Sequence, residues 1–344
     1  MMTDAVHTAD VRLTLEGLIA ALEPLAKVLD QRFEQSAPRA ASVAWSDGRV
    51  TLSAGVNGCR LTLRAEGEAK LANLREAVGY HAEAAGIAPC IRWRQGRPAG
   101  LPGNMMLAKV VRNQRISPSF RRLRLAGDFS RLAGGGPHVR LNLGPAGAGW
   151  PHCDGSGTTT WPGGIGAWHR PPYTIRAMGA DCSWIDIDVV LHDGGRVTDW
   201  LSRCSIGEPL ALSGPGGKAP GTAEWVGYVG DETALPVIAY TLARLTPETR
   251  GTACLIVPDP RDRQVLAHPP GIDVRWLTRG FGTSLMNAIT ELAIPDGPRF
   301  VFVAGERRQV DNARAHLARQ GLAKHEMQAV AYWQAAVRHE DAAA

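Results

Sequence analysis

The sequence has little of what marks disulfide-rich, metal-binding or membrane-spanning proteins. Its six cysteines are scattered over 344 residues without a C-x-x-C pair or a metal-ligand spacing, which argues against a disulfide framework and against a zinc site. No run approaches the roughly 18 apolar residues of a membrane-spanning helix, and the stretch MMTDAVHTADVRLT has no apolar signal core. We therefore expect a soluble, cytoplasmic protein that neither enters the membrane nor holds a metal ion.

The sequence also lacks long basic stretches interleaved with aromatic residues. Its formal net charge is +5, and the positive residues are spread along the chain, so we expect no nucleic acid as a partner. A small anionic ligand or cofactor accounts for the excess charge equally well. The motifs G-x-S-x-G, the P-loop and H-E-x-x-H are absent too, which gives no support to a serine hydrolase, a P-loop enzyme or a zinc protease.

Length and hydrophobic periodicity predict a multidomain chain. Residues 1–97 combine two amphipathic helical patterns with a hairpin around Ser46-Asp47-Gly48, and predict a small accessory α+β domain. The Gly- and Pro-rich stretch 96–104 is expected to be a linker. Residues 104–220 hold short strands separated by turn signals and predict an antiparallel β-barrel. Residues 221–336 alternate strands with helices and predict an α/β domain with a parallel sheet.

Two features of the predicted barrel domain lead to expectations about burial. The segment 144–169 is dense in glycine, contains three tryptophans and is expected to be a long surface loop rather than core. The strand WIDIDVVLH places Asp186 and Asp188 on one face. Because this face lies opposite the apolar residues, we expect both carboxylates to be solvated rather than to form an acid/base pair.

A glycine-containing turn follows the predicted strand in VVLHDGGRVTDWLSRC (189–204). The strand ends at His192 and a helix begins near Thr198. The free N–H groups of a helix start suit a pyrophosphate, and Gly195 would allow a close backbone approach. An ordinary capped helix after a tight turn explains the pattern as well.

The predicted α/β domain has three more such strand ends. In YVGDETALPVIAYTL (228–242), Gly230 ends a strand and Thr233 lies near a helix start, where open α/β sheets bind ligands; a capped helix is the alternative. The stretch FVAGERRQV (302–310) ends a strand at the same edge, with a solvated loop as its alternative. The loop IVPDPRDRQVL (256–266) follows the second strand, where dinucleotide folds meet the adenosine ribose. The loop does not distinguish NADH from NADPH. Asp259 and Asp262 would suit the 2′-hydroxyl of NADH, whereas Arg261 and Arg263 would suit the 2′-phosphate of NADPH.

The stretch WHRPPYTIR (168–176) contains an arginine suited to phosphate, a ring suited to stacking and a hydroxyl suited to a hydrogen bond; a proline-stiffened turn into a strand is the alternative. Together with other pieces it resembles the siderophore-interacting proteins, which are FAD-binding ferric-siderophore reductases of the ferredoxin-reductase-like superfamily. The pieces are PPYTIR, VVLH, GRVTDW, SGPGG, VGDETALP, VAGE and AYW, in this order within 105–334. Residues 1–97 resemble a small bacterial domain family of unknown function that ends in a similar IRW strand.

The resemblance implies roles for individual residues. Tyr173 would lie against the isoalloxazine and Thr174 near its reactive N5 edge, so these two are the predicted catalytic residues. Further cofactor-binding residues are expected on the flavin side at Arg170, Arg176, His192, Gly195, Val197 and Thr198. On the nicotinamide side they are Gly230, Asp231, Glu232, Thr233, Gly305 and Glu306. Arg140, in the strand HVRLNL, would face the anionic siderophore.

The sequence departs from the family pattern in three places. The family's arginine two positions before the tyrosine is replaced by Pro171, and Arg170 is displaced by one position. The tail AYWQAA lacks the glycine before Tyr332 and the arginine after Trp333. The Gly/Trp-rich segment before Arg170 is longer than in the family. These departures concern the phosphate contact and siderophore recognition.

The predicted function is that of an FAD-dependent reductase, acting as a monomer, that uses NADPH or NADH. It would reduce the iron of a ferric siderophore or another ferric chelate and release ferrous iron. One alternative is a flavin-dependent reductase that passes electrons to a protein partner. Another is a ferric-siderophore binding module without turnover. The intact stretches GRVTDW and VGDETALP favour bound flavin and a nicotinamide donor over the binding module.

Overall fold

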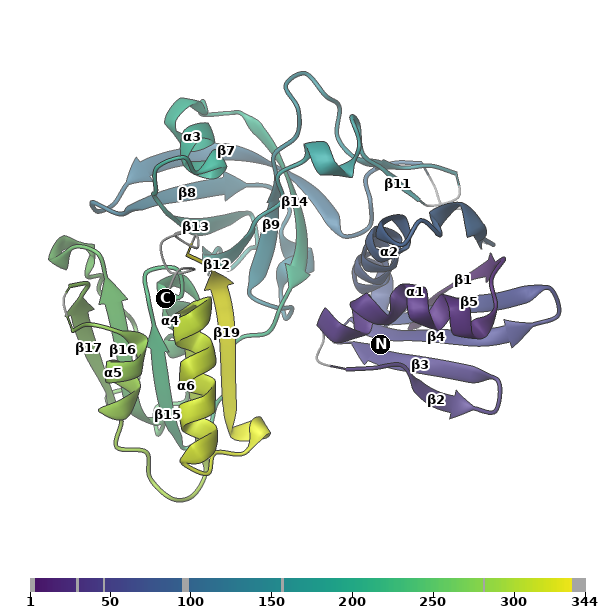
Figure 1. Cartoon of the computed structure of the whole chain (residues 1–344). Helices are drawn as coiled ribbons and strands as arrows, with labels where there is room; N and C mark the ends of the chain where they lie inside the picture. The colour runs from purple at the N-terminus through teal and green to yellow at the C-terminus, as the bar shows by residue number, and fades with distance from the viewer. Residues whose placement is uncertain are drawn as a thin grey trace, which may run out of the picture. The chain divides into compact units, whose positions relative to one another are not determined.

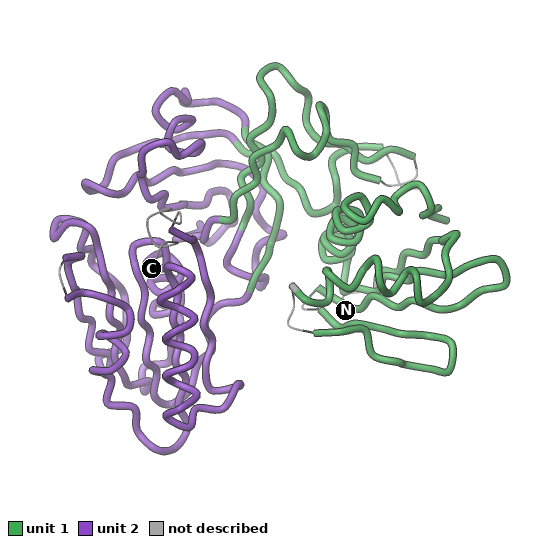
Figure 2. Tube along the Cα trace, viewed as in Figure 1, with its two compact units in different colours: residues 1–108, 139–172, 210–217 green, residues 109–138, 173–209, 218–344 purple. Residues whose placement is uncertain are grey.

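The computed structural model describes residues 4–28, 31–45, 47–94, 99–155, 158–280 and 282–335. The chain divides into two compact units, shown in green and purple in Figure 2. The first unit comprises Met1–Ala108, Val139–Pro172 and Leu210–Gly217. The second unit comprises Lys109–His138, Tyr173–Pro209 and Lys218–Ala344.

The accessory part of the first unit is a six-stranded sheet with two helices packed on it (Figure 1). The strands have the order β2-β3-β4-β5-β1-β6, with β1 at Asp4–Val11, β2 at Glu34–Ala37, β3 at Ala40–Trp45, β4 at Gly48–Gly55, β5 at Gly58–Glu66 and β6 at Ile91–Trp93. The helices are α1 (Leu15–Val28) and α2 (Gly67–Ala84). Leu22, Leu61 and Leu74 share one fully buried core, because apolar residues recur at helical spacing on helices and at alternate positions on strands. Strand β1 was not predicted, since the polar His7 occupies one of its buried positions.

Most described residues of the Gly- and Trp-rich segment 144–169 lie at the surface, as predicted, but Trp161 and Trp168 are buried, so the expectation that the segment contributes nothing to a core was wrong. It contains the strand pair β10 (His152–Cys153) and β11 (Thr159–Thr160) and a short 3-10 helix. Trp161 and Trp168 are 9% and 6% exposed and pack with Met105. A side-chain carbon at Gly144 would lie 2.5 Å from the Trp168 ring. Gly144 therefore makes room for the Trp168 ring of this small tryptophan cluster.

Six strands close into a barrel in the order β12-β13-β8-β7-β14-β9. Their bounds are β7 Met105–Arg115, β8 Phe120–Ala126, β9 His138–Asn142, β12 Pro172–Met178, β13 Trp184–Val190 and β14 Pro209–Gly216. Strands β8 and β13 pair antiparallel with Leu123 opposite Ile187 and Leu125 opposite Ile185. These four side chains are fully buried, because alternate residues of a barrel strand point into its interior.

The other face of β8 and β13 carries arginine–carboxylate pairs, so the prediction that Asp186 and Asp188 are solvated was wrong. Asp186 lies opposite Arg124 and Asp188 opposite Arg122 in the strand register, and the aspartates are 3% and 2% exposed. Arg124 donates two hydrogen bonds of 2.7 Å to Asp186, and Arg122 donates at 2.6 Å and 2.8 Å to Asp188. Cross-strand pairs of opposite charge stabilise a sheet, and the long arginine side chains cover the carboxylates.

The second unit contains a five-stranded parallel sheet of order β17-β16-β15-β18-β19. Its strands are β15 Trp225–Gly230, β16 Arg250–Val257, β17 Ile272–Thr278, β18 Arg299–Glu306 and β19 Met327–Trp333. Its helices are α4 (Leu235–Leu242), α5 (Leu285–Thr290) and α6 (Arg307–Arg319). Tyr228 packs with α4, whereas Val229 packs with α5 and α6 on the other face (Figure 1). Because helices cover both faces of the sheet, strands such as β15 carry continuous apolar runs instead of alternating apolar and polar residues. The barrel and this sheet confirm the predicted fold class.

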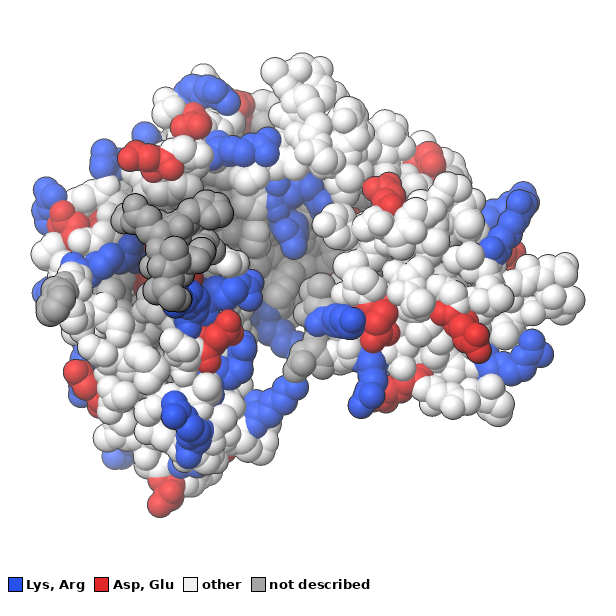
Figure 3. Space-filling view, in the orientation of Figure 1, with Lys and Arg blue, Asp and Glu red and all other residues white. Residues whose placement is uncertain are grey.

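The described residues contain neither a candidate membrane span nor a candidate metal cluster. No helix among them is long and apolar enough to cross a membrane. They also contain no group of three or more His, Cys, Asp or Glu side chains that could hold a metal ion. Figure 3 shows basic and acidic side chains interspersed over the visible face of the molecule. The positive charge of the chain is thus distributed on this face rather than gathered in one patch.

Candidate functional site

Strand β12 carries the two residues predicted to lie against a flavin. Thr174 is 5% exposed, and burial raises the pKa of the neighbouring Tyr173 phenol. Burial also lowers the pKa of Arg176 on the same strand. Its Nε lies 3.6 Å from Asp188 Oδ2 but is buried without a hydrogen-bond partner in the part of the chain that the structure describes. Buried donors are usually paired, and here the ion pair with Asp188 supplies the counter-charge of Arg176.

The turn before α3 (Arg196–Arg203) holds four predicted flavin-side residues. Gly195 is the N-cap, and no side chain caps the helix. A side-chain carbon at Gly195 would lie 2.6 Å from the ring of His192, so the glycine lets this ring lie over the turn. Thr198 Oγ1 accepts a 3.4 Å hydrogen bond from the His192 backbone N–H, and Val197 is buried. The uncapped N–H groups of the first turn suit a phosphate.

At the carboxyl edge of the parallel sheet, Asp231 is the centre of a hydrogen-bond network. Its carboxylate is buried, and Oδ1 accepts from the Thr233 N–H at 2.9 Å and from the Thr233 hydroxyl at 2.5 Å. Oδ2 accepts from Trp333 Nε1 at 2.7 Å. Gly305 has a φ of +156°, and a side-chain carbon there would lie 2.6 Å from Asp231 Oδ2. The fold thus brings three predicted residues together with the tail residue Trp333.

Gly230 ends β15 where the following turn and α4 approach the strand most closely. A side-chain carbon at this position would lie 2.5 Å from the Ala234 side chain and 2.8 Å from Ile238. The glycine therefore allows the tight strand–helix packing that places Asp231 at the sheet edge.

Two further predicted acids at this edge are buried. Glu232 is 6% exposed and pairs with Arg279, while its burial and the adjacent Asp231 raise its pKa. Glu306 is 5% exposed, and its Oε2 accepts from the Gln309 N–H at 3.1 Å as the N-cap of α6. Both side chains have structural partners, so in this structure they shape the edge of the sheet.

The loop after β16 is held in place by Asp262, which is fully buried. Its Oδ1 accepts from the Ser117 hydroxyl at 2.6 Å and from the Ser119 N–H at 2.9 Å. Its Oδ2 accepts from the Asp259 N–H at 3.1 Å. Both oxygens of Asp262 are thus engaged within the second unit, and Asp259 is the acid of this loop that remains near the surface.

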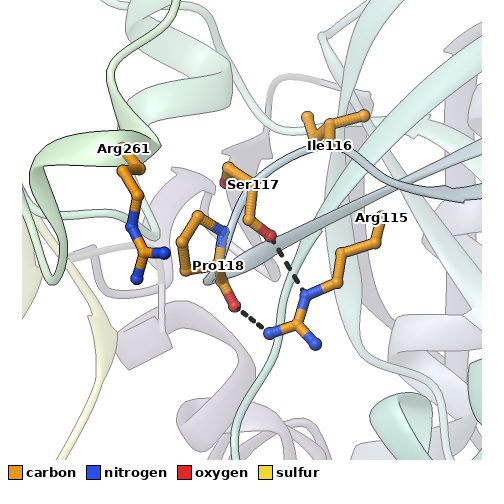
Figure 4. A pocket seen from close by; sticks show the side chains of 5 residues that line it. All are labelled: Arg115, Ile116, Ser117, Pro118 and Arg261. Atoms are coloured by element: carbon orange, nitrogen blue, oxygen red, sulfur yellow. Dashed lines mark hydrogen bonds between the residues drawn. The ribbon is translucent and has the colours of Figure 1, made fainter.

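An open pocket of ≈ 440 Å³ lies beside this loop and is lined by Arg115, Ile116, Ser117, Pro118 and Arg261 (Figure 4). The Arg115 side chain lies against the turn between β7 and β8. It donates there to the Pro118 carbonyl at 2.6 Å and to the Ser117 carbonyl at 3.3 Å. Arg261 is 75% exposed and pairs with Asp259, whose pKa this arginine lowers to about 2. Two guanidinium groups border one pocket, a setting that suits a phosphate.

The two remaining predicted residues lie in the first unit. The Arg170 side chain is 15% exposed and forms an ion pair with Glu76 of α2. Its guanidinium carbon lies 4.2 Å from the centre of the Trp161 ring, and burial lowers its pKa to about 10. Arg140 donates from Nη1 to the main-chain carbonyl of Arg170 at 2.9 Å. The structure therefore joins Arg140 and Arg170 and ties both to the accessory helix α2.

Sequence reasoning missed the roles of several residues in these networks. The buried position of Asp262 could have been found from the D-P-R-D spacing, since Asp259 and Asp262 form a capping box around a 3-10 turn. Glu76 had no such signal, because a glutamate on an amphipathic helix usually faces solvent. Trp333 was noted only as part of the tail.

Two family models match the part of the chain that follows the accessory sheet. Residues 109–219 match the model described as the siderophore-interacting FAD-binding domain. Residues 223–336 match the model described as siderophore-interacting protein. Together the two ranges cover more than half of the chain and contain every predicted site residue.

Curated proteins and solved structures include similar chains. Ferric vibriobactin reductase from Vibrio cholerae is 32% identical over 177 residues, which are 48% of this chain and 65% of that protein. NADPH-dependent ferric-chelate reductase from Escherichia coli is 27% identical over 66% of this chain and 91% of that protein. The crystal structure of a siderophore utilization protein from T. fusca has a TM-score of 0.59 at 26% identity, over 71% of this chain and 96% of that chain. The chain thus spans less than two thirds of the Vibrio relative.

Proposed function

The chain belongs, over residues 109–336, to the siderophore-interacting protein family, and on this basis we propose that it is an FAD-dependent reductase of ferric siderophores or related ferric chelates. One observation carries the proposal: within the second unit, the first turn of α3 follows a glycine N-cap and has no side-chain cap, so its free N–H groups suit an anionic cofactor. The Vibrio and Escherichia relatives, whose names describe ferric reductases, support it.

The chemistry of iron explains why reduction would release it. Ferric ion is a hard cation that siderophore oxygens hold tightly, and ferrous ion is held far less tightly. Bound FAD would supply the conversion of a two-electron hydride donor into single electrons, so one nicotinamide would reduce two ferric ions. In this proposal the ring of Tyr173 orients the flat cofactor, and the Thr174 hydroxyl hydrogen-bonds its edge.

NADPH is the electron donor that we propose. Asp262 has both oxygens engaged, which removes one of the acids that could receive the 2′-hydroxyl of NADH. Arg115 and Arg261 border the pocket beside the same loop, and arginine suits the 2′-phosphate of NADPH. The name of the Escherichia relative supports this choice.

A single series of measurements on the purified full-length chain tests the reductase. We expect a yellow protein with bound FAD whose visible absorbance bleaches when NADPH is added without oxygen. Addition of ferric citrate and a ferrous trap should then restore the absorbance and yield the coloured ferrous complex. A colourless protein that takes up no FAD would refute the proposal. Bleaching by NADPH without any ferrous product from several ferric chelates would favour a protein electron acceptor, and bound FAD with no bleaching would favour the binding module.

Variants of β12 test the flavin site. We expect Tyr173→Ala and Thr174→Ala each to raise the dissociation constant for FAD by about tenfold, because one loses the stacking ring and the other the buried hydroxyl. Arg170→Ala should have a smaller effect, since its guanidinium is engaged by Glu76 and Trp161. Thr222→Ala, at an exposed threonine, is the control. Equal and severe loss of FAD in Arg170→Ala would show that this arginine contacts the phosphate.

Variants of the loop after β16 test the donor. We expect Arg261→Ala to raise the KM for NADPH by about tenfold and to leave the KM for NADH unchanged, because only the 2′-phosphate contact is lost. Arg263→Ala is the matched control, since Arg263 is exposed on the same loop but does not line the pocket. Equal changes for both nucleotides, or a wild-type preference for NADH, would contradict the assignment.

A further inference from the structure

Helix α2 of the accessory part is joined to the linker and to Arg170 by a buried polar network. Glu76 uses both carboxylate oxygens, since Oε1 pairs with Arg170 Nη2 and Oε2 accepts from Asn104 Nδ2 at 2.8 Å. The same Asn104 nitrogen donates to Asn73 Oδ1 at 2.9 Å. Asn104 is 2% exposed, and the Glu76 and Arg170 side chains are 17% and 15% exposed. The accessory helix therefore reaches a residue of the WHRPPYTIR stretch directly.

The network continues from Arg170 into the barrel strands of the first unit. Arg170 Nε donates to Asn142 Oδ1 on β9 at 3.4 Å. Asn142 Nδ2 in turn donates to the Ser213 hydroxyl on β14 at 2.7 Å, and both residues are buried. The face of the Arg170 guanidinium is covered by Trp161. Helix α2, strand β9 and the Gly/Trp-rich segment thus meet at one arginine, and Asn142 connects it to β14.

Independent contacts place α2 against the same surroundings. Asn73 Nδ2 donates to the Pro215 carbonyl on β14 at 3.2 Å. Gly103 lies so close to α2 that a side-chain carbon there would be 3.3 Å from the Glu68 carbonyl oxygen. Burial lowers the pKa of Arg75 on α2 to about 10, and the nearby Cys153 and Asp154 of the Gly/Trp-rich segment oppose that shift. The contact is therefore broader than one ion pair.

The energetics favour a docking role for Arg170. A guanidinium loses much hydration when it is buried, and the loss is tolerable only with a counter-charge and further partners. Here the carboxylate of Glu76, the amide oxygen of Asn142 and the ring of Trp161 supply them. An arginine held on so many sides has little freedom to turn toward another anion. The one-position displacement by Pro171 coincides with this different use of the side chain.

Arg170 also connects the accessory helix to the residue predicted to face the siderophore. Its main-chain carbonyl accepts the 2.9 Å hydrogen bond from Arg140 Nη1, and Arg140 itself is exposed. The side chain of Arg170 points to Glu76 while its main chain holds Arg140. A shift of Arg170 would therefore change the position of the Arg140 guanidinium.

We propose that Arg170 docks the accessory domain onto the barrel, and that Glu76 is a positioning residue that holds Arg140, through Arg170, for an anionic ferric chelate. The chelate part rests on the proposed function, whereas the docking part does not. The accessory domain is then a fixed part of the substrate site rather than a tethered appendage. In this role the accessory domain binds no ligand itself. Its helix α2 fixes the position of Arg140, which lies on β9.

Hydrogen exchange of the full-length, FAD-loaded chain tests the docking. We compare Glu76→Gln with Glu83→Gln, which replaces an exposed glutamate of the same helix. Glu76→Gln should accelerate exchange about tenfold in peptides that cover 99–107 and 144–169, while peptides of β15 and β18 stay unchanged. Glu76→Asp, which keeps the charge, should restore part of the protection. Exchange in these peptides that is the same for Glu76→Gln and for Glu83→Gln would overturn the docking role.

Chelate affinity, measured by quenching of tryptophan fluorescence, tests the positioning. Glu76→Gln should weaken binding of anionic ferric citrate about tenfold and leave binding of a neutral ferric tris-hydroxamate unchanged, because only the anion depends on Arg140. A merely structural defect would weaken both chelates equally. Tighter binding of ferric citrate would show that Glu76 acts only as a nearby negative charge. Either result overturns the positioning role.

The two proposals fail in different ways. If neither chelate binds to the wild-type chain, the proposed substrate is wrong and the positioning role falls with it, while hydrogen exchange still decides the docking. If both chelates bind and Glu76→Gln changes neither affinity, the proposed function stands and the positioning role is refuted.

Discussion

Each unit contains a charged side chain that is held by several partners, and the two charges are stabilised in opposite ways. In the first unit the cation Arg170 is surrounded by a carboxylate, an amide and a tryptophan ring. In the second unit the anion Asp231 is surrounded by neutral donors, namely the N–H and hydroxyl of Thr233 and the indole of Trp333. Neither charge is left without partners, but only Arg170 depends on a single counter-charge.

The difference shows how much tertiary structure each centre requires. Asp231 directly follows a parallel strand, and two of its three bonds come from a residue two positions further along the chain. Most of its surroundings would form wherever this turn forms. Arg170 takes its partners from the accessory helix, the Gly/Trp-rich segment and a barrel strand. Its environment exists only when all of these segments have packed, so we expect it to be the more sensitive of the two.

The largest expected effect is that of Arg170→Ala on stability. This change leaves the largely buried carboxylate of Glu76, which is 17% exposed, without its cation. We expect a loss of about 3 kcal/mol, the lower end of the cost for a fully buried pair. Urea unfolding followed by tryptophan fluorescence measures the loss, with Arg92→Ala at an exposed position of β6 as the control. A loss below about 1 kcal/mol, as for a surface ion pair, would remove the contrast between the two centres.

Asp231→Asn should have a smaller effect, of about 2 kcal/mol. The amide keeps one acceptor oxygen but sets its NH₂ group against either Trp333 or Thr233, and the bonds lose their charge-assisted strength. The same urea unfolding applies, with Asp311→Asn at a half-exposed position of α6 as the control. A loss larger than that of Arg170→Ala would invert the comparison.

The smallest expected effect concerns the exposed pair of Asp259 and Arg261, which serves as a reference for both buried centres. Arg261 lowers the pKa of Asp259 from 3.8 to about 2. The stability that this carboxylate contributes is therefore present above pH 3.8 and is lost as the pH falls toward about 2. In Asp259→Asn this part of the acid dependence should disappear, which thermal unfolding between pH 5 and pH 2 would measure at a few closely spaced values. An unchanged acid profile would show that the pair contributes nothing.

Periodicity predicted the fold class because both sheets follow simple burial rules. The strands around Tyr228 and Val303 are covered on both faces and appear as apolar runs, whereas β8 and β13 alternate. The same rules failed for Asp186 and Asp188, because their burial comes from arginines on the neighbouring strand. They failed again for the segment around Trp161, since high glycine content indicates a loop and does not reveal a cluster of packed rings.

The sequence by itself determined where the backbone must turn closely at the ends of strands. A side-chain carbon would lie 2.6 Å from His192 at Gly195 and 2.5 Å from Ala234 at Gly230, and neighbours so near in the sequence can be recognised locally. Only the tertiary structure decided what Arg170 contacts. Its neighbours along the chain are compatible with a phosphate contact, but Glu76 lies far away in the sequence, and both Glu76 and the nearer Trp161 meet Arg170 only through packing. Local residues set backbone geometry, whereas the partner of a long, charged side chain depends on which segments fold against it.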